Sequence, residues 1–263
     1  MPLIFGAIAP HPPILIPAIG QENLESIKKT KEALEELEQE LYHAKPDTVI
    51  IISPHGQLMD EAFTMNHSPV LKGNFKAFGD LETKLEFKNN LGLAYKIRES
   101  VETKIPLILT SDEELDHGTL VPLHYLTQHL KEVSIIPLGF SMLERQAHFQ
   151  FGQEIRKVLN HSNERVAVIA SGDLSHRLTQ DAPAGYSAKG KKFDETLIKL
   201  LKEKKIDEIL SLDKSLIEEA GECGYRSILI LLGIFGQLNY KFKILSYEGP
   251  FGVGYLVANM VIG

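Results

Sequence analysis

The hydrophobic positions of this chain follow two patterns that alternate along the sequence. Short runs of consecutive apolar and β-branched residues, as at residues 47–53 (DTVIIIS), are typical of strands buried on both faces. Between them lie stretches such as residues 22–43, where apolar side chains recur at helical spacing among charged ones. This alternation predicts an α/β fold with a central, mainly parallel sheet flanked by helices.

The same pattern places the boundaries of the elements. We expect strands at residues 3–9, 47–53, 107–109, 133–140, 165–171, 240–247 and 253–261. We expect helices at residues 22–43, 91–101, 119–130, 143–159, 186–212 (in two pieces) and 224–238. Residues 63–87 are more ambiguous and indicate a small mixed-sheet excursion, and the turn at residues 248–252 predicts a C-terminal β-hairpin. Since no repeat or flexible linker divides the chain, we predict one domain over residues 1–263.

Composition and charge narrow the functional classes. The 263 residues suffice to bury a core without disulfides, and Cys223 is the only cysteine, which fits a reducing compartment. The net charge of −7 argues against a nucleic-acid-binding surface, because phosphate contacts require clustered Lys and Arg. The apolar runs are shorter than the roughly 20 residues of a spanning helix, and the N-terminus lacks the basic start of a signal peptide. We therefore expect a cytoplasmic protein that binds neither nucleic acid nor membranes.

Histidines follow three of the predicted buried strands. His11 lies in IAPHPP after the first strand, His55 in IISPHG after the second, and His176 in IASGDLSH beyond the strand at residues 165–171. Ligands of open α/β sheets bind beyond the carboxyl ends of the strands, so these three imidazoles should converge on one crevice. Neutral imidazole is a good ligand for iron, zinc and related ions. The sequence therefore predicts a site for one divalent metal ion.

The candidate histidines differ in their local sequence. Prolines beside His11 and His55 stiffen both turns, which favours a ligand role over that of an ordinary loop residue. His176 is a candidate for orientation or proton transfer, and His117, between a short strand and a helix, for a supporting role or a helix cap. His124, seven residues after His117, would share a helical face with it, which core packing explains equally well, and we expect the other five histidines to be exposed: His43, His67, His129, His148 and His161.

Two histidines rarely complete a metal site, so a third ligand is needed. Glu222 in EAGECGYRS is the favoured carboxylate, although a charge at a helix N-terminus is the simpler interpretation. The adjacent Cys223 could ligate instead, and Glu248 in the closing hairpin is a third candidate. The residues alone leave these alternatives open.

Five motifs, in order over nearly the whole chain, resemble one known superfamily. They are APHPP around His11, SPHG around His55, DHGTLVPL around His117, SGDLSH around His176 and GECG around Glu222. With them the sequence resembles the class III extradiol ring-cleavage dioxygenases of the LigB type. It is most similar to the branch associated with the AmmeMemoRadiSam system, which also contains the Memo-like proteins.

The resemblance implies roles for these residues. Iron(II) would be held by His11, His55 and Glu222, with zinc(II) as the alternative ion, and a catechol-like aromatic and dioxygen would be the substrates. His176 would be the acid–base histidine, and His117 would hydrogen-bond to substrate or bound oxygen. Some members of the superfamily require a small partner subunit. The C-terminal hairpin could also pair two copies of the chain in a homo-oligomer.

Two other functions compete with the extradiol dioxygenase. Zinc at the same residues would activate water, as in a hydrolase. Memo-like relatives keep a similar histidine set with a cysteine near Cys223, and a chain of that kind would bind metal or a small ligand without turnover. A shared fold does not by itself transfer activity.

Overall fold

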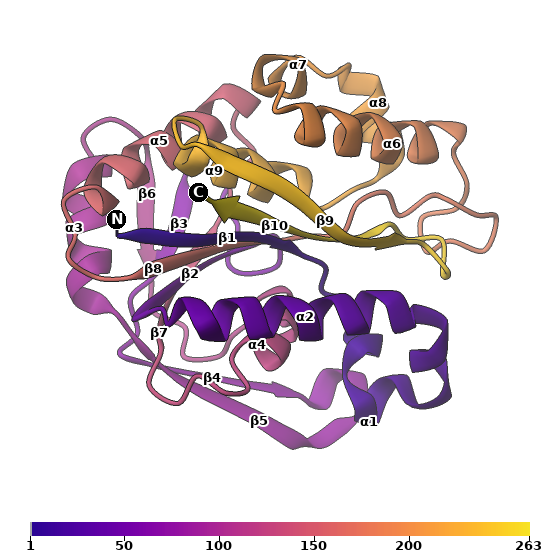
Figure 1. Cartoon of the computed structure of the whole chain (residues 1–263), viewed down its shortest axis with the longest axis horizontal. Coiled ribbons are helices and arrows are strands. Elements are labelled where there is room, and N and C mark those ends of the chain that lie inside the picture. Colours follow the sequence, from indigo (N-terminus) through magenta and orange to yellow (C-terminus); the bar gives the residue numbers. More distant parts are fainter. Residues whose placement is uncertain (1) are drawn as a thin grey trace.

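Ten strands form one mixed sheet at the centre of the computed structural model, which describes residues 2–263 (Figure 1). They are β1 (Leu3–Ala9), β2 (Thr48–Ser53), β3 (Phe63–Asn66), β4 (Val70–Phe75), β5 (Asp80–Asn89), β6 (Leu107–Thr110), β7 (Ser134–Gly139), β8 (Val166–Ser171), β9 (Tyr240–Glu248) and β10 (Tyr255–Ile262). The order across the sheet is β4-β5-β7-β2-β8-β1-β10-β9, with β3 and β6 joined to it through β7. β7, β2, β8 and β1 run parallel, and β9 and β10 form an antiparallel pair at one edge. The predicted α/β fold with its C-terminal hairpin is confirmed.

Helices cover both faces of the sheet. They are α1 (Pro17–Gly20), α2 (Lys28–Ala44), α3 (Leu91–Val101), α4 (His117–Leu126), α5 (Arg145–Leu159), α6 (Ala188–Glu203), α7 (Ile206–Leu210), α8 (Lys214–Ala220) and α9 (Tyr225–Phe235). Three short 3₁₀ segments are η1 (Pro13–Leu15), η2 (Gln21–Ile27) and η3 (Lys76–Phe78). In Figure 1, α2 and α4 lie below the sheet, and α5, α6 and α9 lie above it.

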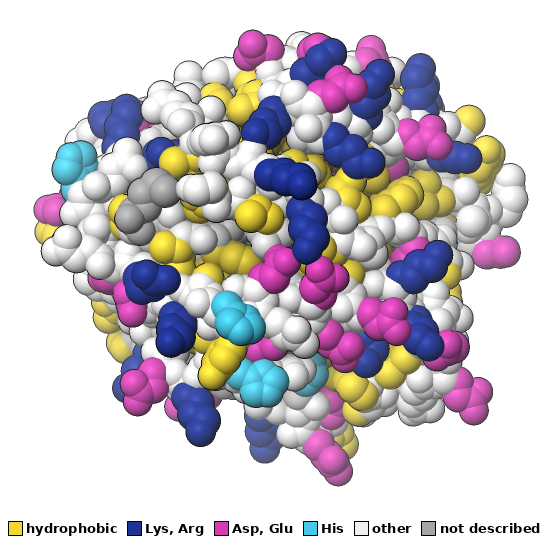
Figure 2. Space-filling model, in the orientation of Figure 1, with side chains coloured by type: hydrophobic (Ala, Val, Ile, Leu, Met, Phe, Trp, Pro, Cys, Tyr) yellow, Lys and Arg dark blue, Asp and Glu magenta, His cyan; other side chains and the backbone are white. Residues whose placement is uncertain are grey.

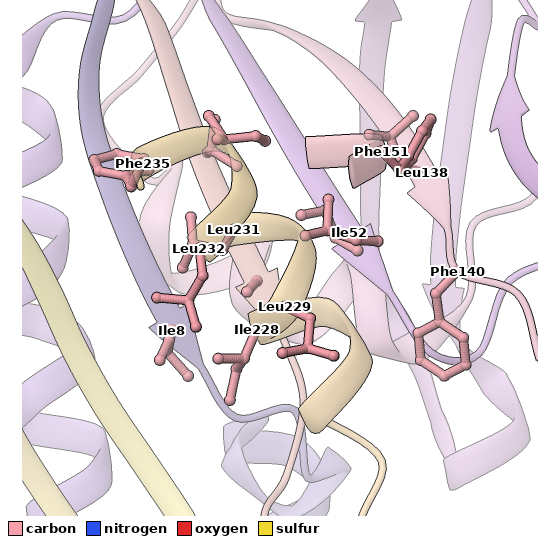
Figure 3. Close-up of a cluster of buried hydrophobic side chains, with 14 of the residues drawn as sticks. Ile8, Ile52, Leu138, Phe140, Phe151, Ile228, Leu229, Leu231, Leu232 and Phe235 are labelled. Atoms are coloured by element: carbon pink, nitrogen blue, oxygen red, sulfur yellow. The ribbon is translucent and has the colours of Figure 1, made fainter. Parts of the chain in front are cut away.

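Alternation of side chains along the central strands produces two hydrophobic cores. In β2, Ile50 and Ile52 face a core shared with α3, α5 and α9, while Val49 and Ile51 face a core shared with α2 and α4. Neighbouring residues of a strand point to opposite faces, so a strand buried on both faces is apolar throughout, as the sequence showed. Figure 3 shows the first core, in which Ile228 and Phe235 of α9 lie among side chains from several elements of the sheet and α5.

Two glycines allow α5 and α9 to pack closely. A Cβ atom on Gly152 would lie 2.1 Å from the carbonyl oxygen of Ile230, and one on Gly233 would lie 2.1 Å from that of Phe149. No side chain fits at these distances, so the two helices meet through their backbones. This contact fixes α9, whose N-terminal end carries part of the site described below.

The start of α2 differs from the sequence prediction, which began the helix at residue 22. Residues Gln21–Ile27 form the 3₁₀ segment η2, and the α-helix begins at Lys28. The Glu248 carboxylate accepts hydrogen bonds from the N–H and the hydroxyl of Thr30, both at 2.7 Å, and so satisfies a donor of the first helical turn. Because this partner comes from β9, 218 positions away in sequence, the helix start could not be recognised locally.

The surface seen in Figure 2 carries interspersed positive and negative side chains rather than a large patch of one sign. None of the helices within residues 2–263 is long and apolar enough to cross a membrane.

Candidate metal centre

Three neighbouring parallel strands deliver the candidate residues to one edge of the sheet. β2, β8 and β1 are adjacent, and His55, Asp173 and His11 follow their last residues by two positions each. The chain leaving β8 stays in register with β1, because the N–H of Gly172 donates to the carbonyl of Ala9. His11 and His55 therefore converge as expected, with their Nε2 atoms 3.0 Å apart, and the third predicted histidine, His176, lies beside them, its Nε2 3.9 Å from the Cys223 sulfur.

The hydrogen bonds of His11 determine which of its nitrogens carries the proton. His11 is 2 % exposed, and its Nδ1 lies 2.9 Å from the Ser171 hydroxyl oxygen. That hydroxyl donates its one proton to the carbonyl of Gly118, so it must accept from His11 Nδ1–H. Nε2 of His11 is then left with a lone pair, which is the form that binds metal ions.

A proline explains why the Gly118 carbonyl is available. Gly118 and Pro122 are four positions apart in α4, and proline has no N–H to donate to that carbonyl. The Ser171 hydroxyl takes the place of the missing helical donor. A helix irregularity visible in the sequence thus supports the orientation of His11.

The imidazole of His55 faces that of His11, with the two Nε2 atoms 3.0 Å apart. His55 is exposed as a residue, yet its ring packs on both His11 and His117, the latter stacked at 4.3 Å between centroids. Burial of the ring, and then the nearby His11 and His117, lower the pKa of His55 to about 4. Burial and His11 likewise lower the pKa of His117. Both rings are therefore neutral at pH 7, as ligation or hydrogen bonding requires.

Cys223 approaches the two histidines from the turn before α9. Its sulfur lies 3.6 Å from Nε2 of His11 and 3.9 Å from Nε2 of His176, and it accepts a hydrogen bond from the N–H of Asp173. This approach depends on two glycines in contact, since a Cβ on Gly172 would lie 2.1 Å from the Cα of Gly224. Burial and the Asp173 carboxylate raise the pKa of the Cys223 thiol, so a bound cation would have to displace its proton.

Glu222 does not join this group. One of its carboxylate oxygens accepts the N–H of Tyr225 at 2.6 Å and so caps the start of α9, while burial raises its pKa to about 7. Neighbouring residues in this turn point in different directions, and it is Cys223 that faces the histidines. Glu248, the third candidate, is bound to Thr30 at the start of α2.

Asp173 is a site residue that the sequence analysis missed. One of its oxygens accepts the backbone N–H of His11 at 3.0 Å, and the other lies 3.9 Å from His11 Nε2 and 3.8 Å from His176 Nε2. Burial alone would raise the pKa of Asp173, but the neighbouring His11 and His176 lower it, so the group is a carboxylate. The available signal was an acidic residue two positions after a buried strand and three positions before the candidate His176.

Within the described part of the chain, two overlapping groups have the ligand atoms of a metal site. One is His11, His55 and Cys223, and the other is Asp173, His176 and Cys223; in each, the atoms lie within 4.8 Å of one another. The 3.0 Å between the histidine nitrogens suits two ligands of one ion, since nitrogens bound at about 2.1 Å lie about 3.0 Å apart at adjacent octahedral positions and about 3.4 Å apart at tetrahedral ones. The donors present therefore fit a transition-metal ion.

A cleft of about 1170 Å³ opens beside the His55 and His117 rings. Its walls come from the ends of β2, β3 and β7, from the β4–β5 hairpin, and from the segment before α4. Many of the lining side chains are polar: besides the two histidines they include Gln57, Thr64, Asn66, Lys72, Asn74, Lys76, Thr110, Asp112, Glu113, Glu114, Asp116 and Thr119. This volume is large enough for a small organic ligand beside the candidate metal ligands.

Comparison with known proteins decides the family. Residues 6–258 match the family model described as the catalytic LigB subunit of aromatic ring-opening dioxygenase. The chain belongs to the LigB family. A Clostridium acetobutylicum protein is 35 % identical over 263 residues, covering 96 % of this LigB-family chain and 56 % of its own length.

Other relatives with similar sequences fall into two groups. The 3,4-dihydroxyphenylacetate 2,3-dioxygenase of Escherichia coli is 28 % identical over 51 % of this LigB-family chain and 51 % of its own length. A MEMO1 family protein of Methanococcus maripaludis is 26 % identical over 78 % of the chain and 66 % of its own length. The chain thus spans only about half of the first two relatives. An uncharacterized Escherichia coli protein shares the fold, with a TM-score of 0.70 at 14 % identity, covering 98 % of this chain and 99 % of that one.

Among the histidines outside the site of this LigB-family chain, one prediction was wrong. His148 is fully buried, and its two ring nitrogens each lie 3.0 Å from a backbone carbonyl, those of Glu144 and Ser141. A histidine at helical spacing with apolar neighbours in α5 should have been assigned to the buried face. The other four predicted exposed histidines are exposed: His43, His67, His129 and His161.

Proposed function

We propose that this LigB-family chain is a non-haem iron(II)-dependent extradiol dioxygenase that opens the ring of a catechol-like aromatic. The observation that carries the proposal is the convergence of two imidazoles, a thiol and a carboxylate beside an open cleft. His11 is held there in the tautomer that presents a lone pair. Soft and imidazole ligands together favour a transition metal over calcium or magnesium.

The ligands that we propose are His11, His55 and Cys223. Glu222, which the family resemblance would assign to the third position, is engaged with the start of α9. Iron(II) at this position would lower the pKa of a substrate hydroxyl and leave room for substrate and dioxygen. Zinc(II) is the alternative ion, since it accepts the same donors.

The remaining site residues are proposed to hold and move protons. His176 lies beside the Asp173 carboxylate, with 3.8 Å between Nε2 and Oδ2, so a proton accepted by the imidazole would be stabilised electrostatically. Histidine is the side chain most often used as a general acid–base, because its imidazole both accepts and donates protons. His117, neutral and at the cleft wall, can donate to or accept from a substrate oxygen.

A second candidate is a Memo-like metal-binding protein without turnover. The observation that favours it is the position of Cys223, where a carboxylate would complete the ligand set of a two-histidine iron oxygenase. In that case the metal and the cleft would serve binding alone, and His176 would have no acid–base role.

Oxygen uptake distinguishes the two candidates. Protein loaded with iron(II) under anaerobic conditions would be mixed with aerated catechols, and oxygen consumption recorded together with ring-opened product. We expect substrate-dependent uptake that is lost in His176→Ala with its metal retained, and unchanged in His161→Ala, a control at an exposed histidine. Iron-loaded protein that consumes no oxygen with any catechol would contradict the dioxygenase and favour the Memo-like role.

A further inference from the structure

The β4–β5 hairpin places an aromatic side chain at the mouth of the candidate active site. Phe78 is the last residue of the 3₁₀ segment η3 between these strands, it lines the cleft, and 40 % of its surface is exposed. Its ring lies 5.3 Å from that of His117, at an interplanar angle of 64°. Among the described residues that line the cleft, Phe78 is the one phenylalanine or tyrosine.

The turn that carries Phe78 is well defined. Gly79, which follows it, has a φ of +92° that other residues rarely adopt, and its N–H donates to the carbonyl of Lys76. On the far side, a carboxylate oxygen of Asp80 accepts the N–H groups of Glu82 and Thr83. The ring is thus presented from an ordered turn rather than from a loose loop.

Phe78 is the outermost of a row of rings that leads to the candidate metal ligands. From it the row continues through His117 and His55 to His11, with centroid distances of 5.3, 4.3 and 4.7 Å. His55 and Phe78 both line the cleft, and Phe78 is the one phenylalanine or tyrosine of that lining against which a bound aromatic molecule can pack. Aromatic rings at such distances attract each other in offset or edge-to-face arrangements.

We propose that Phe78 is the side chain against which the aromatic ring of the substrate packs, so that it selects aromatic substrates for this site. The inference rests on the proposed function, because it takes the ligand of the cleft to be a catechol. Contact with the ring would also remove the exposed part of Phe78 from water, which adds to binding. The role is in substrate binding and not in the chemical step.

The chain contains no tryptophan, so a single introduced indole can report on this position. Phe78→Trp would place the fluorophore at the cleft wall, and Leu81→Trp supplies a matched control on the same hairpin. Leu81 is 68 % exposed and lies outside the cleft lining. Emission of the metal-loaded variants would be recorded as catechol is added, and catechol binding to wild type and to Phe78→Ala would be measured by calorimetry.

We expect a saturable change of emission in Phe78→Trp beyond that in Leu81→Trp, and about 10-fold weaker binding in Phe78→Ala, which corresponds to about 1.4 kcal/mol. Leu81→Ala should bind as wild type does. If wild type binds catechol but both indoles respond alike, or Phe78→Ala binds equally well, the role of Phe78 is refuted and the proposed function stands. If wild type binds no catechol, both proposals are overturned together.

Discussion

The substitution Ser171→Ala tests whether the tautomer of His11 controls metal binding. Ser171 is fully buried, and its hydroxyl is the acceptor that keeps the His11 proton on Nδ1. Without this hydroxyl, the His11 Nδ1–H is buried with no partner, which costs about 1–3 kcal/mol. The tautomer with its proton on Nε2 then becomes more populated. Loss of such a supporting partner typically weakens metal binding about 10- to 100-fold, or about 1.4–2.7 kcal/mol.

The assay is anaerobic calorimetric titration with iron(II), repeated with zinc(II), on protein whose folding is checked by circular dichroism. Ser227→Ala is the control, because Ser227 is equally buried but its hydroxyl oxygen has no hydrogen-bond partner in the structure. We expect weaker binding in Ser171→Ala and wild-type affinity in Ser227→Ala. Folded Ser171→Ala protein that binds either metal as tightly as wild type would refute the reasoning.

Three further predictions concern stability and the shape of the site. Burial lowers the pKa of His148 to about 4, so between pH 6.5 and 4 the unfolded chain binds a proton there that the folded chain does not. The free energy of unfolding should therefore decrease by about 3 kcal/mol as the pH is lowered from 6.5 to 4. Urea unfolding across this range should show a smaller decrease in His148→Gln than in wild type, and equal decreases would contradict the prediction. Gly172→Ala should destabilise the fold by about 1–3 kcal/mol and weaken metal binding, because its Cβ would push Gly224 and with it Cys223 away; unchanged melting and metal titration would count against this contact. Gly92→Ala, in the first turn of α3 with no close neighbour, should raise stability by about 0.5 kcal/mol, and a lower melting temperature would show that the space is not free.

The fold could be predicted from the sequence where burial alone determines the pattern. β2 and β8 are buried at every position, and their apolar runs reveal them without any knowledge of their partners. The start of α2 was missed because its donor is satisfied by Glu248, which belongs to a strand at the other end of the chain. Local sequence patterns contain no information about such distant partners.

In the candidate site too, some residues could be recognised from local sequence and others depended on distant partners. His11 and His55 were recognisable because each follows a buried strand, and parallel strands that lie side by side end at the same edge. The choice between Glu222 and Cys223 depends on how a short turn orients two neighbouring side chains, which a local sequence pattern does not specify: the Cys223 sulfur lies 3.6 Å from His11 Nε2, whereas the Glu222 carboxylate accepts the N–H of Tyr225. Asp173 could not be recognised from the sequence, because its role depends on the register of β8 against β1. That register places its carboxylate where it accepts the backbone N–H of His11.

The central claim is that His11, His55 and Cys223 hold one metal ion. Its most direct test is the iron content, by elemental analysis, of anaerobically loaded wild type, His55→Ala, Cys223→Ala and Glu222→Gln. We predict one iron per chain in wild type and in Glu222→Gln, whose carboxylate serves α9, and loss of bound iron in the other two variants. Full iron content in Cys223→Ala together with its loss in Glu222→Gln would contradict the claim and return the third ligand position to Glu222.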